Sequence, residues 1–126
     1  MNAKPTGPVR TLHLDEQALA RLRELDPDGR HGVVGRVLRA FESSLVRQLA
    51  QLIEARDRGD FAAIGALAHT LKSSSASVGA PALSALCADI ERAVRAGETV
   101  DLGPQVENLL SEGEAALEAV RAMLRT

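Results

Sequence analysis

His69 and Lys72 are the side chains of this 126-residue sequence whose types and spacing most clearly suggest chemistry. Histidine titrates near neutral pH, and its neutral ring is a nucleophile that can accept and release a phosphoryl group. On a helix, Lys72 would lie one turn after His69 and be its neighbour on the surface. An ammonium group there would stabilise an anion bound to the ring, and its like charge would favour the neutral ring.

The residues near His69 in the sequence offer little other chemistry. No carboxylate lies within a turn of it and no second histidine lies at metal-ligand spacing, so we expect neither a hydrolytic triad nor a zinc site. The sequence also lacks a glycine-rich nucleotide loop between a strand and a helix, and we expect no ATP site. A group transferred to His69 would therefore come from a partner and return to one.

The composition favours helices as the elements that position this pair. The chain has 21 Ala and 18 Leu but only two Phe and neither Trp nor Tyr. Ala and Leu lose little freedom in a helix, whereas the aromatic and β-branched residues typical of sheets are scarce. The composition therefore argues against an all-β fold, and the length fits a single domain.

The charge balance argues against nucleic acid as a partner. Fifteen basic and seventeen acidic residues give a net charge of −2, with no basic block and with only two aromatic residues, both Phe, that could stack on bases. The single cysteine, Cys87, cannot form an internal disulfide, so we expect a cytoplasmic protein. Residues 1–11 read as a flexible leader without an apolar run, and we expect no contact with a membrane.

Glycine, proline and aspartate divide the remaining chain, residues 12–126, into five helical stretches. A short one covers about 15–25, with Asp15 as its N-cap. Four longer amphipathic stretches follow at about 32–58, 61–78 and 81–96 and after Gly103-Pro104. Because short connections force neighbouring helices to run in opposite directions, we predict an all-α, antiparallel up-down-up-down four-helix bundle with a short extra N-terminal helix.

A helical-wheel calculation places His69 almost opposite the core-facing side of its helix. Only Lys72 carries a permanent charge between Phe61 and Ala88, and the outer face around His69 consists of small residues. Such a face allows a partner to approach the imidazole closely, so we take it as a partner-binding surface. Its members are Ala62, Gly65, Ala66, Ser73 and Ala76. The two phenylalanines, Phe41 and Phe61, are expected in the core.

The stretch from Ala68 to Ala80, AHTLKSSSASVGA, closely resembles the signature of histidine-containing phosphotransfer (HPt) domains of bacterial two-component phosphorelays, roughly H-x-L-K-G-S-x-x-x-x-G. The resemblance extends over most of the chain, from the Leu14-Asp15 helix to the Ile90-Glu91 pair. It departs from the pattern at Ser73, where the family usually has glycine.

The resemblance implies that His69 is the phosphorylated residue, that Lys72 supports the phosphoryl group, and that Gly79 ends the phosphorylated helix. It implies a carrier rather than an enzyme, one that receives the phosphoryl group from the phosphoaspartate of one response-regulator receiver and yields it to another. Magnesium would be supplied by the receiver. The implied partners are receivers and a hybrid sensor histidine kinase, and a monomer is expected.

Two other classes of function remain open from the residues alone. The first is a non-catalytic adaptor, a helical bundle that binds a signalling partner or a copy of itself through the same small-residue face. The second, weaker one is a hydrolase that uses His69 as a general base.

Overall fold

The computed structural model describes residues 14 and 16–125, and within them it contains five α-helices and no strand. The helices are α2 (Glu16–Glu24), α3 (Val33–Arg58), α4 (Phe61–Ser77), α5 (Pro81–Ala96) and α6 (Leu102–Arg125). The predicted stretches are confirmed to within a few residues at their ends. Residues 1–11, assigned to the leader, and the proposed N-cap Asp15 lie outside the described residues.

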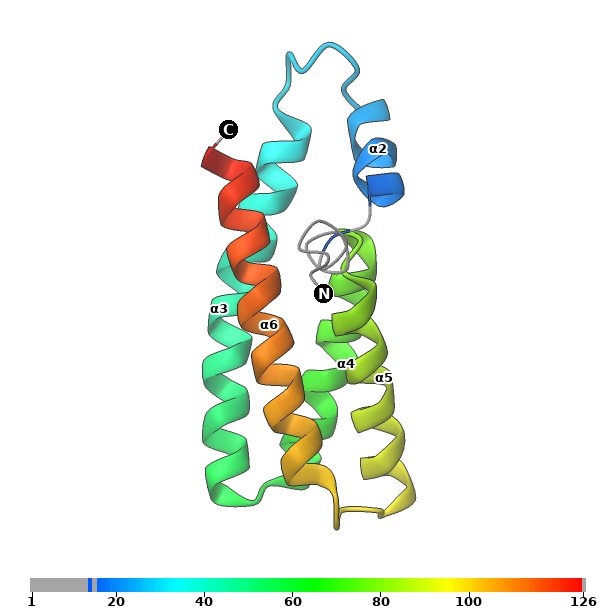
Figure 1. Cartoon of the computed structure of the whole chain (residues 1–126), viewed down its shortest axis with the longest axis vertical. Helices are drawn as coiled ribbons and strands as arrows, with labels where there is room; N and C mark the ends of the chain where they lie inside the picture. Colours follow the sequence, from blue (N-terminus) through cyan, green and yellow to red (C-terminus); the bar gives the residue numbers. More distant parts are fainter. Residues whose placement is uncertain (1–13, 15, 126) are drawn as a thin grey trace, which may run out of the picture.

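The four long helices form an antiparallel bundle in which chain neighbours are also neighbours in space. Helix α3 packs on α4, α4 on α5 and α5 on α6, and α6 closes the ring by packing on α3 (Figure 1). Ion pairs Glu42–Arg121 and Arg56–Glu107 link α3 to α6. The predicted up-down-up-down bundle with a short extra helix is confirmed.

Local signals fix both ends of α4, the helix that carries His69. The Asp60 side chain accepts a hydrogen bond from the backbone N–H of Ala63 at 3.1 Å, so it caps the first turn. At the other end, Gly79 has a φ of 76°, in the left-handed region that favours glycine, and Pro81 is the first residue of α5.

The core is made by one face of each long helix. On α4 the fully buried residues are Ile64, Ala68, Leu71 and Ser75, which matches the face that the wheel turned inward. Phe41 is buried, as predicted. Phe61 is not: 44% of it is exposed, because it is the first residue of α4 and lies at the edge of the core. Its placement in the core was wrong.

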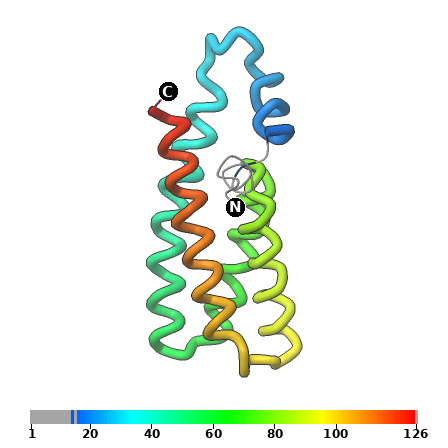
Figure 2. Tube along the Cα trace, in the orientation of Figure 1, coloured from blue at the N-terminus to red at the C-terminus, as the bar shows by residue number. Residues whose placement is uncertain are grey.

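Helix α2 covers the end of the shorter helix pair. Helices α3 and α6 have 26 and 24 residues, against 17 and 16 for α4 and α5, so they extend about 12 Å further at 1.5 Å per residue. In the tube view α2 lies over the α4–α5 connection beside this extension (Figure 2). Its Ala18 and Leu19 are buried there.

The turn between α2 and α3 contains a buried carboxylate. Asp26 Oδ2 accepts hydrogen bonds from the backbone N–H groups of His31 and Val33, at 2.9 and 3.2 Å, and so serves the first turn of α3. Burial raises the pKa of Asp26, but these backbone donors outweigh it and leave the pKa below its ordinary value.

The last helix begins earlier than predicted. Helix α6 starts at Leu102, so Gly103 and Pro104 lie in its first turn. Proline is tolerated there because the N–H groups of the first turn have no acceptor within the helix. None of the helices in the described part of the chain is long and apolar enough to cross a membrane.

Candidate functional site

His69 lies on the outer face of α4, near the middle of that helix. Its side chain is 65% exposed, while the neighbouring residues Ala68 and Leu71 are fully buried. The packing of these two residues fixes the rotation of the helix, and this rotation turns the imidazole outward. The wheel prediction for His69 is therefore confirmed.

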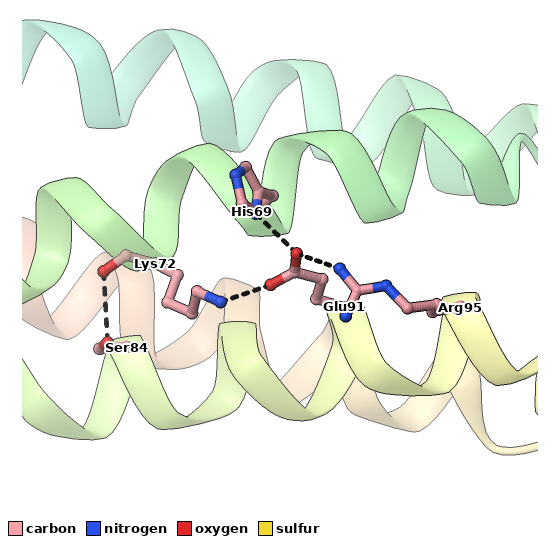
Figure 3. A network of polar contacts seen from close by, with 5 residues as sticks. All are labelled: His69, Lys72, Ser84, Glu91 and Arg95. Carbon is pink, nitrogen blue, oxygen red and sulfur yellow. Dashed lines mark hydrogen bonds and ion pairs between the residues drawn. The ribbon is translucent and has the colours of Figure 1, made fainter.

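A carboxylate from the next helix holds the histidine ring. Glu91 of α5 places Oε2 2.6 Å from His69 Nδ1 and Oε1 2.7 Å from Lys72 Nζ. Arg95, one turn further along α5, donates from Nη2 to the same Oε2 at 2.8 Å. The close view shows Lys72 and Arg95 reaching Glu91 from opposite sides, and the second ring nitrogen, Nε2, pointing away from it (Figure 3).

The environment keeps Glu91 ionised although its side chain is only 9% exposed. The hydrogen bond from Lys72 lowers its pKa most, the bond from His69 comes next, and together they outweigh the cost of burial and hold the pKa at about 2. An ionised carboxylate can only accept hydrogen bonds. The nitrogen that faces it, Nδ1, must therefore carry the proton, which leaves the lone pair of the neutral ring on Nε2.

Close packing between α4 and α5 brings Glu91 within reach. Ser84 Oγ of α5 donates to the backbone carbonyl of Lys72 at 3.2 Å. One turn before His69, a Cβ built on Gly65 would lie 2.9 Å from Val94 Cγ1, closer than real Cβ atoms come. Glycine at this position allows the close approach of the two helices.

The predicted partner-binding residues surround His69 along α4, and one of them also lies against α5. Ala62, Ala66, Ser73 and Ala76 are exposed, and together with His69 they form a single stripe along the helix. Gly65 is half-buried against Val94, so its small size serves the contact between helices more than an approach from outside. A shallow depression of about 490 Å³ lies beside the stripe. It is lined by Ala62, Gly65, Ala66, His69, Thr70, Glu91, Val94 and Arg95.

Sequence reasoning did not find the role of Glu91 or Arg95. The search for a carboxylate was limited to one turn of His69, whereas Glu91 lies 22 residues away along the chain. Two signals were present: Glu91 follows the buried Ile90 on a helix antiparallel to α4, and Arg95 stands at the i+4 position that pairs with it. Within the described residues, no group of three or more His, Cys, Asp or Glu could hold a metal ion.

Comparison with known protein families gives a clear result. The model of the Hpt domain matches residues 36–124, which include α4, α5 and most of α3 and α6. The chain belongs to the Hpt domain family. The match includes His69, Lys72 and Glu91, and membership indicates a role in histidine phosphotransfer.

Two relatives support this membership of the Hpt family. Histidine-containing phosphotransfer protein 2 of Arabidopsis thaliana is 35% identical over 86 residues, covering 66% of this chain and 54% of its own length. The chain thus spans about half the length of this relative. The crystal structure of histidine-containing phosphotransfer protein B from Pseudomonas aeruginosa superimposes with a TM-score of 0.79 at 26% identity, covering 90% of this chain and 95% of that one.

Proposed function

We propose that this Hpt protein is a phosphorelay intermediate that carries a phosphoryl group on His69 between two receiver domains. The observation that carries the proposal is the orientation of the imidazole. Its Nδ1 faces the Glu91 carboxylate at 2.6 Å, and 65% of the side chain is open to a partner. This leaves Nε2 as the nucleophilic atom.

In the transfer step, the Nε2 lone pair attacks the phosphorus atom of a receiver's aspartyl phosphate. A bond forms between Nε2 and phosphorus, the bond between phosphorus and the aspartate oxygen breaks, and the aspartate leaves as a carboxylate. The ring keeps its proton on Nδ1 and becomes positively charged, which strengthens its hydrogen bond to Glu91. Transfer to the second receiver reverses these bond changes and returns the neutral ring.

Two features of the site suit this step. Lys72 lies one turn from His69, and its ammonium group binds the same carboxylate as the ring. A cation in this neighbourhood can stabilise the negative charge of the phosphoryl oxygens. The exposed stripe of Ala62, Ala66, Ser73 and Ala76 has no bulky or charged side chain that would hold a receiver away. By this proposal Ser73, in place of the family's glycine, adds only a hydroxyl to the docking face.

The proposal assigns the remaining chemistry to the partners. Magnesium and the acidic pocket belong to the receiver, and the phosphoryl groups originate from a hybrid sensor histidine kinase. The chain itself acts as a carrier without an ATP site or metal site. We therefore expect no labelling by ATP alone, and labelling by ATP without a kinase would contradict this part of the proposal.

The experiment is a transfer assay with receiver domains that carry ³²P-labelled phosphoaspartate. We compare the wild type with His69→Gln and with His31→Gln, which removes another exposed histidine. The expected result is an acid-labile, base-stable label on the wild type and on His31→Gln and none on His69→Gln. Receiver binding that is equally tight for all three proteins, without transfer of label, would favour the adaptor instead.

A further inference from the structure

In the unphosphorylated protein, two cationic side chains bind the single carboxylate of Glu91. Lys72 and Arg95 both bind this single carboxylate, through Oε1 and Oε2 respectively. A phosphoryl group on Nε2 would add about two negative charges, and Lys72 is the one Asp, Glu, Lys or Arg residue of α4, the helix that carries His69. Lys72 therefore has two possible partners, the carboxylate and the phosphoryl group.

Arg95 differs from Lys72 in where it binds. It lies on the same helix as Glu91, at i+4, and donates to the oxygen that also accepts from His69 Nδ1. Its contact with Glu91 does not depend on the relative position of α4 and α5. Figure 3 shows it on the side of Glu91 opposite Lys72, so it can stay in place while Lys72 turns.

The burial of Glu91 favours a cation that stays bound to it before, during and after the transfer step. The side chain is 9% exposed, and a carboxylate this far removed from water is unfavourable unless a cation pairs with it. An ion pair between two exposed side chains contributes little to stability. In the pair of Arg95 with Glu91, however, the carboxylate is almost inaccessible to solvent. When Lys72 turns away, Arg95 is the remaining side chain with a permanent positive charge on Glu91 within the described residues, beside the ring of His69 that phosphorylation makes positive.

We propose that Arg95 is a positioning residue that keeps the Glu91 carboxylate bound to His69 Nδ1 while Lys72 turns to the phosphoryl group. The inference rests on the proposed function, because it assigns Arg95 a task during phosphorylation. Its test needs neither a receiver nor a phosphoryl group. Failure of the test and failure of the relay proposal can therefore be told apart.

The test uses Lys72→Gln to reproduce the moment at which Lys72 has left Glu91. In full-length protein with ¹⁵N-labelled histidine, long-range ¹H–¹⁵N spectra at mildly alkaline pH give the ratio of the Nδ1–H to the Nε2–H tautomer of His69. We expect Lys72→Gln to keep the wild-type ratio within about twofold, and Lys72→Gln with Arg95→Gln to lower it at least about fivefold, as for loss of a charge-assisted hydrogen bond.

Two further variants separate positioning from general charge effects. Arg92→Gln removes an arginine of α5 that pairs with Asp89 instead of Glu91. Combined with Lys72→Gln, it should leave the tautomer ratio of His69 at the value of Lys72→Gln alone. Arg95→Lys, which restores a cation at i+4, should recover most of the ratio in the Lys72→Gln background. The inference is overturned if Lys72→Gln alone lowers the tautomer ratio of His69 at least about fivefold, or if adding Arg95→Gln to Lys72→Gln lowers it no further. It is also overturned if adding Arg92→Gln to Lys72→Gln lowers the ratio as much as adding Arg95→Gln does.

Discussion

The two nitrogens of the His69 ring have separate tasks because a side chain from another helix binds one of them. Glu91 accepts from Nδ1 and receives Lys72 and Arg95 on its two oxygens. A surface histidine without such a partner exchanges its proton between both nitrogens. By the proposed function, the carboxylate thus selects the nucleophilic atom and stabilises the charge that the ring gains on phosphorylation.

At the residue scale, the first prediction concerns Lys72. Lys72→Ala removes the cation that the proposed function assigns to the phosphoryl group, and we expect transfer from a phosphorylated receiver to slow by about ten- to hundredfold. The fold should remain, because Arg95 still pairs with Glu91. Stopped-flow or rapid-quench transfer kinetics measure the rate, and a loss of helical circular dichroism would contradict the surface placement of Lys72.

The second residue-scale prediction follows from the ionisation of Glu91. Its pKa lies at about 2 in the folded protein, below the ordinary value of 4.5. A lowered pKa stabilises the fold above the ordinary value, and this contribution is lost as the pH falls from about 4.5 to about 2. The stability advantage of the wild type over Glu91→Gln should therefore be full at pH 7 and shrink in this acid range.

Chemical denaturation of the wild type and Glu91→Gln across that range checks the prediction. A difference in unfolding free energy that stays constant from neutral pH to about pH 2 would show that the carboxylate is not held in its ionised form by the folded protein.

At the scale of the helices, the contact between α4 and α5 gives the third prediction. Gly65→Ala places a Cβ 2.9 Å from Val94 Cγ1, and overpacking of this kind typically costs about 1–3 kcal/mol, more than the roughly 1 kcal/mol that alanine gains in a helix. We expect a lower Tm. In Gly35→Ala, the new Cβ meets only the flexible end of Arg39, and we expect a higher Tm.

Thermal unfolding of both variants provides the comparison. Adding Val94→Ala to Gly65→Ala should recover part of the lost stability, because it removes the methyl groups that the new Cβ meets. If Gly65→Ala were stabilised as much as Gly35→Ala, the close approach of α4 and α5 at this point would be wrong.

The helices themselves were predictable, and the reason is local. Periodic Leu and Val residues, the Asp60 cap and the Gly79 turn act within a few residues, so the sequence reveals them directly. The exception is Phe61, whose apolar character predicted burial. Its position at the start of α4 leaves it at the edge of the core, and only the arrangement of the helices decides this.

At the scale of the whole molecule, the candidate site depends on how two neighbouring helices, α4 and α5, pack together. His69 and its outward direction could be predicted because both follow from the rotation of a single helix. Glu91 and Arg95 could not be placed in the same way. Their contact with His69 requires the relative height and rotation of α4 and α5, which are set by packing contacts such as that of Gly65 with Val94.

The fourth prediction concerns the proposed docking face, the exposed stripe through which the bundle would bind a receiver. Ala62→Glu and Ala76→Glu introduce bulk and charge at the two ends of the exposed stripe, and each should slow transfer from a phosphorylated receiver by at least about tenfold. Ala50→Glu, an equal change at an exposed alanine of α3, should leave the rate unchanged. Equal rates for all three variants would place the docking face elsewhere.

The central claim is that Nε2 of His69 carries the phosphoryl group. The most direct measurement is ³¹P and ¹⁵N nuclear magnetic resonance of the protein after transfer from a phosphorylated receiver. The account predicts a single phosphohistidine at residue 69 with phosphorus bonded to Nε2 and the proton on Nδ1. A phosphoryl group on Nδ1, on His31 or on a carboxylate would contradict it.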